Sequence, residues 1–323
     1  TDTDLRAPTL ATQTPSEAVS ETDLQLAQQQ AQIRTIDLSN TAVTNALQHG
    51  KMLSSTHLKQ VQVVSQLYAH GLYQQNQYVL AEQSYNLALK YLSADSNSNA
   101  QQKQARAEMR DLLASSIYFQ GQANKTQAPE LAVVDLLRIS NVVPESKYAI
   151  SGEFEAANLL LSQQQWQQAV AVLIPFQQRY PQHQFSASIP AKLAQSYEAL
   201  GQWDLAAEQL LIIVANQPSG ALKREAQYTA AEYYLKAGET EKARLTFRTY
   251  AKTYPEPFDI AQEVRLKMSG FYQQSNEPNK EYYWYRQILN FHSKQGASSK
   301  PVSGREIEIA SIAASRLAHA HQQ

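Results

Sequence analysis

Few residues in this chain have the types and spacing that catalysis or metal binding requires. His319 and His321 are two positions apart, so on a helix their rings point to different faces. Glu198, Glu225 and Glu232 could in principle supply an acid/base pair, but a solvated helix face accounts for them more simply. The sequence has no glycine-rich phosphate loop and no His-Glu-x-x-His zinc helix. We therefore predict no catalytic residue, no metal site and no cofactor.

The composition narrows the classes of partner. The 323 residues include 28 basic and 29 acidic side chains, and this balance argues against a broad nucleic-acid-binding face. The longest apolar run, 169–176, is far shorter than the roughly 20 residues that cross a bilayer. We expect no nucleic-acid partner and no direct membrane insertion. The absence of cysteine excludes disulfides and thiol catalysis, and it is compatible with an oxidising compartment.

The positions that could carry function must be held by helices. Ala, Leu, Gln and Glu are abundant, and the alternation typical of strands is missing, so the class reads as all-α. Within this background the same residue types recur at intervals of 37 residues. The four aligned columns are Ala132, Ala169, Ala206 and Ala243; Leu136, Leu173, Leu210 and Phe247; Ile139, Phe176, Ile213 and Tyr250; and Pro144, Pro181, Pro218 and Pro255.

One unit shows what the columns do. Ala231 is small where two helices cross, and Tyr234 fills the space one turn later. Gly238 ends the first helix because it adopts the left-handed conformation without a Cβ penalty. Ala243 faces Ala231 from the second helix, and Pro255 stops that helix. Each such hairpin leaves one face unburied, so the units must stack.

The stretch "LAQSYEALGQWDLAAEQLLIIVANQP", residues 193–218, resembles the tetratricopeptide repeat (TPR). The resemblance implies an α-solenoid of antiparallel helix hairpins wound into a right-handed superhelix, with a period of about 37 residues instead of the usual 34. The Tyr-Pro stops at 180–181 and 254–255, each followed by a polar spacer, resemble the TPR modules of bacterial envelope proteins. Those modules are of the outer-membrane-assembly lipoprotein and TolA-binding protein type.

The domain organisation follows from where the pattern is clear. Polar stretches at 93–104 and 121–128 read as lengthened loops between early repeats, and 293–304 reads as a loop before the last helix. Residues 23–33 and 39–49 are interpreted as a degenerate opening hairpin. We predict a flexible leader at 1–21, a helical segment at 22–56 and a TPR-like solenoid at 57–323, with the cleanest repeats at 129–255, a degenerate repeat at 256–292 and a terminal helix at 305–321.

The TPR resemblance also implies a binding wall on the first helix of each hairpin. Its inward positions lie one and four residues after the small crossing residue, and three and six before it. A TPR clamp for a C-terminal carboxylate is not expected, because Phe154 occupies the position of the required lysine beside Asn158. The alternative is that the wall packs on another part of the same protein. The candidate partner-binding residues are Tyr73, Phe154, Asn158, Glu198, Tyr228, Glu232, Arg265 and Tyr272.

The sequence thus predicts a non-enzymatic scaffold or adaptor that binds a peptide or partner protein in the groove. By resemblance, it would be a periplasmic or envelope-associated protein and a subunit of an envelope complex. Two alternatives stay open: a segment of a longer structural or self-assembling solenoid, and a cytosolic regulatory TPR module. The sequence does not name the partner.

Overall fold

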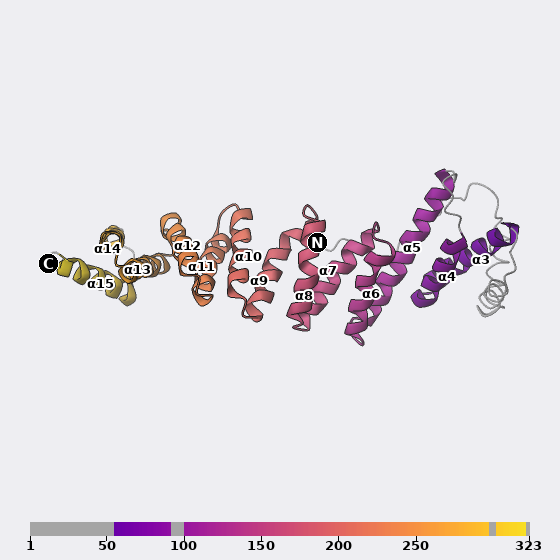
Figure 1. The fold of residues 1–323 in the computed structure, drawn as a ribbon, viewed down its shortest axis with the longest axis horizontal. Coiled ribbons are helices and arrows are strands. Elements are labelled where there is room, and N and C mark those ends of the chain that lie inside the picture. Colours follow the sequence, from indigo (N-terminus) through magenta and orange to yellow (C-terminus); the bar gives the residue numbers. More distant parts are fainter. Residues whose placement is uncertain (1–54, 92–99, 297–301, 321–323) are drawn as a thin grey trace. The chain divides into compact units, whose positions relative to one another are not determined.

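The computed structural model describes residues 55–91, 100–296 and 302–320, and within these ranges it consists of helices with no strand (Figure 1). The predicted leader and nearly all of the 22–56 segment lie outside the described residues. The chain divides into two compact units after Phe176. We call residues up to Phe176 unit 1 and the remainder unit 2, and each is described by itself.

Successive helices pair as antiparallel hairpins, which makes the chain an all-α solenoid as predicted. The division between the units falls inside α8. Unit 1 contains α3 (Ser55–Gln74), α4 (Tyr78–Tyr91), α5 (Ala100–Asn124), α6 (Pro129–Val142), α7 (Lys147–Ser162) and most of α8 (Trp166–Arg179). Unit 2 contains a 3-10 turn, η1 (Gln184–Ser188), then α9 (Ile189–Ala199), α10 (Trp203–Asn216), α11 (Ala221–Lys236), α12 (Thr240–Thr253), α13 (Phe258–Gln274), α14 (Pro278–Gly296) and α15 (Gly304–Ala320).

The small residues predicted at the helix crossings are confirmed as buried. Ala231 on α11 and Ala243 on α12 are both fully buried, and so are Ala157 and Ala169 in the hairpin of α7 and α8. A larger side chain at these positions would separate the helices, because protein interiors are close-packed. The predicted stop is also confirmed, since α12 ends at Thr253, two residues before Pro255.

The same turn recurs in five of the described hairpins, more regularly than the glycine column predicts, but not between α5 and α6. The residue after the turn donates its N–H to a carbonyl five residues earlier: Glu239 bonds Tyr234 at 2.9 Å, and Gln165 bonds Leu160 at 2.9 Å. This is the hydrogen bond of a left-handed helix C-cap. The residues with positive φ that form these turns are Asn76, Gln164, Gly201, Gly238 and Asn276.

The repeat at 256–292 is regular after a shift of one residue. α11 has 16 residues and α13 has 17, so the extra residue lies within α13. Asn276 therefore follows Gly238 by 38 positions instead of 37. The crossing residue of α13 is Ser269, which is fully buried, and not Met268, where the 37-residue spacing places it. One residue corresponds to about 100° of rotation on a helix, so every later position on α13 faces a different direction from the predicted one.

The prediction of long loops around α5 is wrong in part. Residues 100–104 and 121–124 belong to α5, which is 25 residues long. Gly121 lies at the closest approach to α6, because a Cβ built on it would stand 2.7 Å from Cγ of Leu136. Gln102, Lys103 and Gln104 lie on the exposed side of this long first helix, whereas Asn124 is half-buried and donates to Asp135 at 3.0 Å. The predicted loop at 293–304 is likewise helical up to Gly296.

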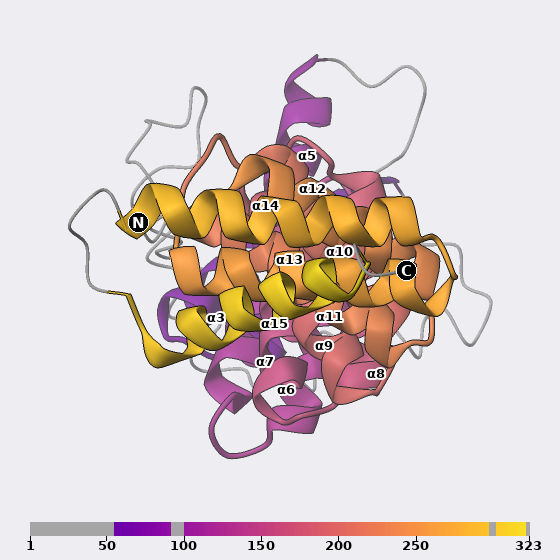
Figure 2. The ribbon, with the colours of Figure 1, turned by 90° about the vertical axis from the view of Figure 1, so that its left-hand side faces the viewer.

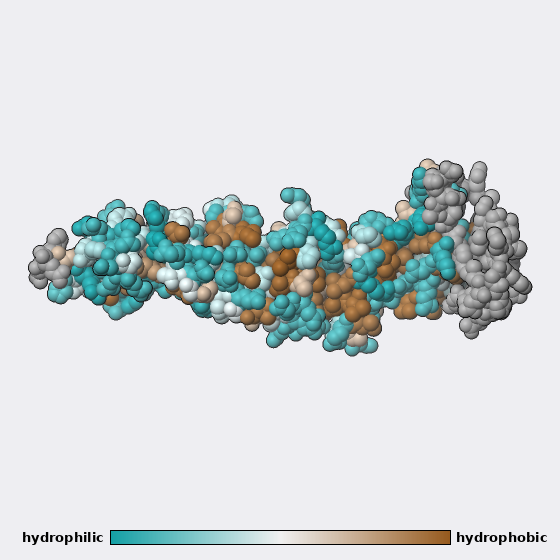
Figure 3. All heavy atoms as spheres, viewed as in Figure 1, coloured by the Kyte–Doolittle hydropathy of each residue, from teal (hydrophilic) through white to brown (hydrophobic). Residues whose placement is uncertain are grey.

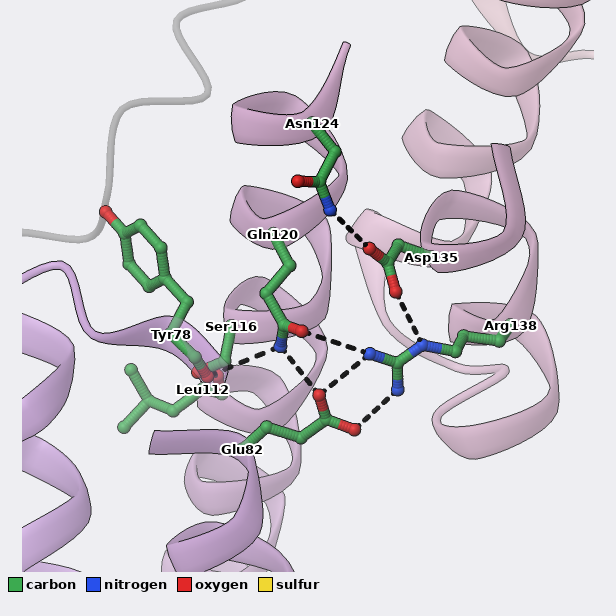
Figure 4. A network of polar contacts seen from close by, with 8 residues as sticks. All are labelled: Tyr78, Glu82, Leu112, Ser116, Gln120, Asn124, Asp135 and Arg138. Atoms are coloured by element: carbon green, nitrogen blue, oxygen red, sulfur yellow. Dashed lines mark hydrogen bonds and ion pairs between the residues drawn. The ribbon is translucent and has the colours of Figure 1, made fainter. Parts of the chain in front are cut away.

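A polar network joins α4, α5 and α6 (Figure 4). Arg138 of α6 donates two hydrogen bonds to the carboxylate of Glu82 on α4, and it also donates to Asp135 at 3.1 Å. Gln120 of α5 lies between the two partners. It donates to Glu82 at 2.6 Å and to the carbonyl of Tyr78 at 3.3 Å. The network fixes how the first two hairpins stack.

The terminal helix, expected at 305–321, is α15, and it packs against both α13 and α14 (Figure 2). Ile309 and Ala313 of α15 are fully buried against Ile288 and Tyr285 of α14. Glu306 caps its own helix by accepting the N–H of Ser303 at 2.9 Å. At the end of unit 2, α15 thus packs on the α13–α14 hairpin as the first helix of another hairpin would.

Candidate protein-binding surface

The wall of unit 2 is centred on Tyr228 of α11. Its half-buried ring makes edge contacts with Phe247 at 5.8 Å and Tyr250 at 5.7 Å, both on α12. The partner helix thereby fixes the direction of the ring. Burial raises the pKa of Tyr228 to about 12, and the nearby carboxylates of Glu232 and Glu263 add to the shift. The hydroxyl stays protonated at neutral pH and can donate a hydrogen bond.

Carboxylates surround this ring. Glu225 and Glu232 precede and follow Tyr228 by three and four residues on α11, which places both on the same helix face. Glu225 is exposed, whereas Glu232 is half-buried and lies 3.0 Å from the ammonium of Lys267 on α13. Glu232 therefore links consecutive first helices, while the carboxylate of Glu225 remains accessible.

A second ion pair continues along the same wall. Glu263 of α13 receives two hydrogen bonds from Arg305 of α15, at 2.5 and 3.2 Å. On α9, Glu198 is exposed, and burial together with this carboxylate raises the pKa of Tyr233 on α11. The accessible charge of the wall on α9 and α11 is thus acidic at Glu198 and Glu225.

The wall of unit 1 on α7 is less polar. Phe154 is half-buried, with its ring 6.0 Å from that of Phe176 on α8. Asn158, one turn further along α7, has a buried Oδ1 that accepts no hydrogen bond. Leu161 is half-buried on the same face. This part of the wall therefore offers mainly an apolar contact, because the amide oxygen of Asn158 is buried.

Three of the candidate residues are buried and do not lie on an open wall. Tyr73 packs its ring against Tyr78 and Phe119, both within 6.3 Å. Arg265 is only 1% exposed, and Tyr272 accepts a hydrogen bond from Arg244 of α12 at 2.8 Å. For the two α13 residues the cause is the extra residue in that helix, which rotates them away from the wall.

The sequence interpretation missed the residues that take their place. With Ser269 as the crossing residue, the wall positions of α13 are Glu263, Leu266, Gly270 and Gln273. The available signal was the turn: Asn276 and Pro278 correspond to Gly238 and Thr240 of the preceding repeat, and each follows its counterpart by 38 residues instead of 37.

Arg265 is unusual among the buried residues because it is a charged side chain that is almost fully buried. Its Nη1 donates to Gln262 at 3.3 Å, its Nη2 is buried without a hydrogen-bond partner, and its guanidinium lies 3.8 Å from the ring centre of Phe291. Burial lowers its pKa to about 10. This arginine is a packing element between α13 and α14.

Among the described residues, the tryptophans and histidines add no further site. Trp284 is buried, while Trp166 and Trp203 are partly exposed at the starts of α8 and α10. Lys236 lies 4.2 Å from the ring centre of Trp203. His319 is exposed, and His321 lies outside the described residues. Among the residues that the structure describes, no group of three or more His, Asp or Glu side chains could hold a metal ion. None of the described helices combines the length and apolarity needed to cross a membrane.

The fold and this wall define the class: a solenoid of stacked helix hairpins, an architecture that presents extended binding surfaces. The sequence model of the tetratricopeptide repeat matches residues 192–220 and 225–257. These stretches cover most of α9 with α10 and of α11 with α12, the two hairpins whose first helices carry Glu198 and Glu225. The chain therefore carries two stretches that match the tetratricopeptide repeat, within a solenoid of helix hairpins. A comparison with curated proteins found no match.

Solved structures with a similar arrangement include BtubC from P. vanneervenii, yeast Tom70 and the apo form of RapI. BtubC is 16% identical, with 79% of this chain and 94% of BtubC covered and a TM-score of 0.33. Tom70 is 11% identical, with 93% and 59% covered and a TM-score of 0.32. RapI is 11% identical, with 92% and 84% covered and a TM-score of 0.31. The chain thus spans 59% of the length of the Tom70 chain.

Proposed function

We propose that this protein is a non-enzymatic scaffold that binds a peptide or an extended segment of a partner protein along the wall of unit 2. The observation that carries the proposal is Tyr228, an aromatic ring fixed by α12 and flanked on its own helix by carboxylates. Rigid, partly exposed aromatic residues are typical anchors of protein interfaces. Groups of this kind along a helical groove suit a segment held by side-chain contacts.

The charges of the wall favour a segment with basic residues. Glu225 and Glu198 are exposed, whereas Lys267 is already paired with Glu232. Complementary charges at the rim of an interface increase the association rate and select among partners more than they add affinity. The segment in this proposal therefore places an apolar or aromatic residue on Tyr228 and a Lys or Arg near Glu225.

The proposed location is the bacterial cell envelope, as a subunit of an envelope complex. This part of the proposal is supported by the Tyr-Pro stops with their polar spacers and by the absence of cysteine. A cytosolic regulatory module is the alternative.

A photo-crosslinking residue in place of Glu225 tests both parts. The full chain is incubated with periplasmic and with cytosolic extract, irradiated, and the attached protein is identified by mass spectrometry. The proposal expects one dominant periplasmic partner, whose crosslinked segment, made as a synthetic peptide, binds the wild-type chain. Loss of peptide binding in Tyr228→Ala but not in Tyr283→Ala, an exposed tyrosine of α14, supports the wall. Equal binding by the two variants contradicts it, and a partner found only in the cytosolic extract contradicts the envelope.

A further inference from the structure

One face of α3, the first described helix, is apolar and open. Val64, Leu67, Tyr68 and Gly71 follow the helical spacing that places them in a single stripe, which we call the end stripe. Val64 is 53% exposed. Leu67, Tyr68 and Gly71 are half-buried, and a Cβ added at Gly71 would meet no atom within 4 Å, so no described residue packs closely on the stripe at that point.

The equivalent stripe is buried in later hairpins. Val64 stands five residues before the crossing residue of its helix, Ala69. The residues five positions before the crossing residues of α7, α11 and α13 are Gly152, Ala226 and Val264, and all three are buried. The residues one position before the crossing residues, equivalent to Tyr68, are Ala156, Ala230 and Met268, and each is fully buried.

The contact that buries this stripe is visible inside unit 1. Gly152 of α7 approaches the preceding hairpin so closely that a Cβ built on it would stand 2.7 Å from the carbonyl oxygen of Leu136 on α6. The stripe is therefore the face on which each first helix receives the hairpin before it. On α3 the receiving face is present, and no described residue covers it.

The chain itself supplies a covering segment of suitable length. The 54 residues that precede α3 include two stretches, 23–33 and 39–49, that have the apolar spacing of short helices. In the second stretch Ala42, Val43, Ala46 and Leu47 fall on one helical face. Gly50 follows, and only a few residues then lead to Ser55, where α3 begins.

We propose that residues 23–49 pack on the end stripe as the hairpin that precedes α3. A tether of a few residues holds this segment near the stripe at an effective concentration in the millimolar range. A second copy of the chain would have to compete at its much lower solution concentration. The segment closes the apolar end of the array, the role that terminal repeats perform in solenoid proteins, and it keeps the array from associating end to end.

The absence of native cysteine allows a direct test in the full chain. Val64→Cys places one thiol in the end stripe, and Val134→Cys places one on α6 at a position that is 58% exposed. Figure 3 shows that the face it draws has several brown apolar areas on a mostly teal surface. The proposal expects the Val64→Cys thiol to react with a maleimide at least ten times more slowly than the Val134→Cys thiol. Equal rates overturn it.

A crosslink distinguishes the two occupants. Val64→Cys combined with Ala46→Cys should give a monomeric product with a short bismaleimide, in a yield that does not change when the protein is diluted. A product that is mainly dimeric, or protection of the Val64→Cys thiol that disappears on dilution, overturns the proposal in favour of a second copy. As an independent measure, Val64→Asp should lower the melting temperature by several degrees while Val134→Asp leaves it unchanged, and equal shifts contradict the proposal.

Discussion

Gly152 of α7 lies directly against the backbone of Leu136 on α6. A Cβ built on Gly152 would stand 2.7 Å from the carbonyl oxygen of Leu136 and 3.0 Å from Cδ1 of Ile139. Backbone cannot move aside as a flexible side chain does, so these two helices stack at this distance only because residue 152 has no side chain. Stacking of one hairpin on the next depends on such contacts in addition to the crossings within hairpins.

Gly152→Ala should therefore destabilise the protein, although alanine favours helix. Overpacking typically costs about 1–3 kcal/mol, which exceeds the gain of up to about 1 kcal/mol from helix propensity. Gly270→Ala is the matched control, because Gly270 is also in a helix but a Cβ there meets nothing within 4 Å. Chemical denaturation should show a loss for the first variant and a small gain for the second. A gain in both would contradict the close contact.

Gln164→Gly should stabilise the chain. Gln164 has a φ of 59°, and a residue with a Cβ pays about 1 kcal/mol or more in this left-handed conformation. Gly201→Ala makes the reverse change at the same turn position one repeat later, where φ is 69°. We expect a gain of about 1 kcal/mol for Gln164→Gly and a similar loss for Gly201→Ala. Unchanged melting temperatures for both variants would show that the turns tolerate any residue.

The hairpins could be predicted from the sequence because each one follows local rules. The crossing residues Ala231 and Ala243, the apolar column and the stop at Pro255 all leave a signal in residue type. The turns at Asn76, Gln164 and Asn276 give a weaker signal in residue type, because none of them has a glycine at the position with positive φ. The length of α5 was missed because polar residues suit an exposed helix face as well as a loop.

The candidate wall could be predicted only where the 37-residue spacing between repeats continues. Tyr228, Glu232 and Glu198 lie on partly or fully exposed positions of α9 and α11, and their binding role stays a prediction. Arg265 and Tyr272 were misplaced by one residue added inside α13. Such an insertion leaves the helix apolar and continuous, so no change in composition reveals it, yet it rotates everything that follows.

Arg265→Met should leave the protein equally stable or make it more stable. The arginine is buried, its Nη2 has no hydrogen-bond partner, and its described contacts include no carboxylate. Replacing buried charge by an apolar side chain of similar size is often neutral or stabilising, by about 1–4 kcal/mol.

Arg138→Met is the contrasting variant, because it leaves Glu82 and Asp135 without their guanidinium partner. Removing one member of a buried ion pair costs about 3–5 kcal/mol, and the partial exposure of Arg138 puts the expectation near the lower end. Denaturant midpoints of the two variants should therefore move in opposite directions or differ clearly. Equal losses would show that Arg265 has a stabilising partner.

Tyr228→Ala should weaken binding of the partner segment by about 10- to 100-fold, the loss expected for an aromatic anchor. Glu225→Lys should act differently, by slowing association and reducing its dependence on salt, because Glu225 is an exposed rim charge. Stopped-flow or surface-based kinetics at two ionic strengths would separate the effects. If Tyr228→Ala changed only the association rate, the ring would not be an anchor.

The Glu82 network should make stability depend on pH in the acid range. Burial opposes ionisation of Glu82, but hydrogen bonds from Arg138 and Gln120 outweigh it and hold the pKa of this carboxyl below 4.5. A carboxyl whose pKa is lower in the folded state stabilises the fold above its unfolded pKa. That contribution is lost as the pH falls through the folded-state pKa.

Glu82→Gln isolates this contribution. At pH 7 the variant should be less stable than the wild type by about 1–3 kcal/mol, because hydrogen bonds to a charged group are replaced by neutral ones. As the pH falls from 5 towards 3, the wild type should lose stability faster than the variant, so the difference should narrow. Glu241→Gln is the control, since the same kind of pair with Arg244 involves a fully exposed carboxylate. A difference between wild type and Glu82→Gln that stayed constant from pH 7 to pH 3 would show that the ionised form of Glu82 is not what the network stabilises.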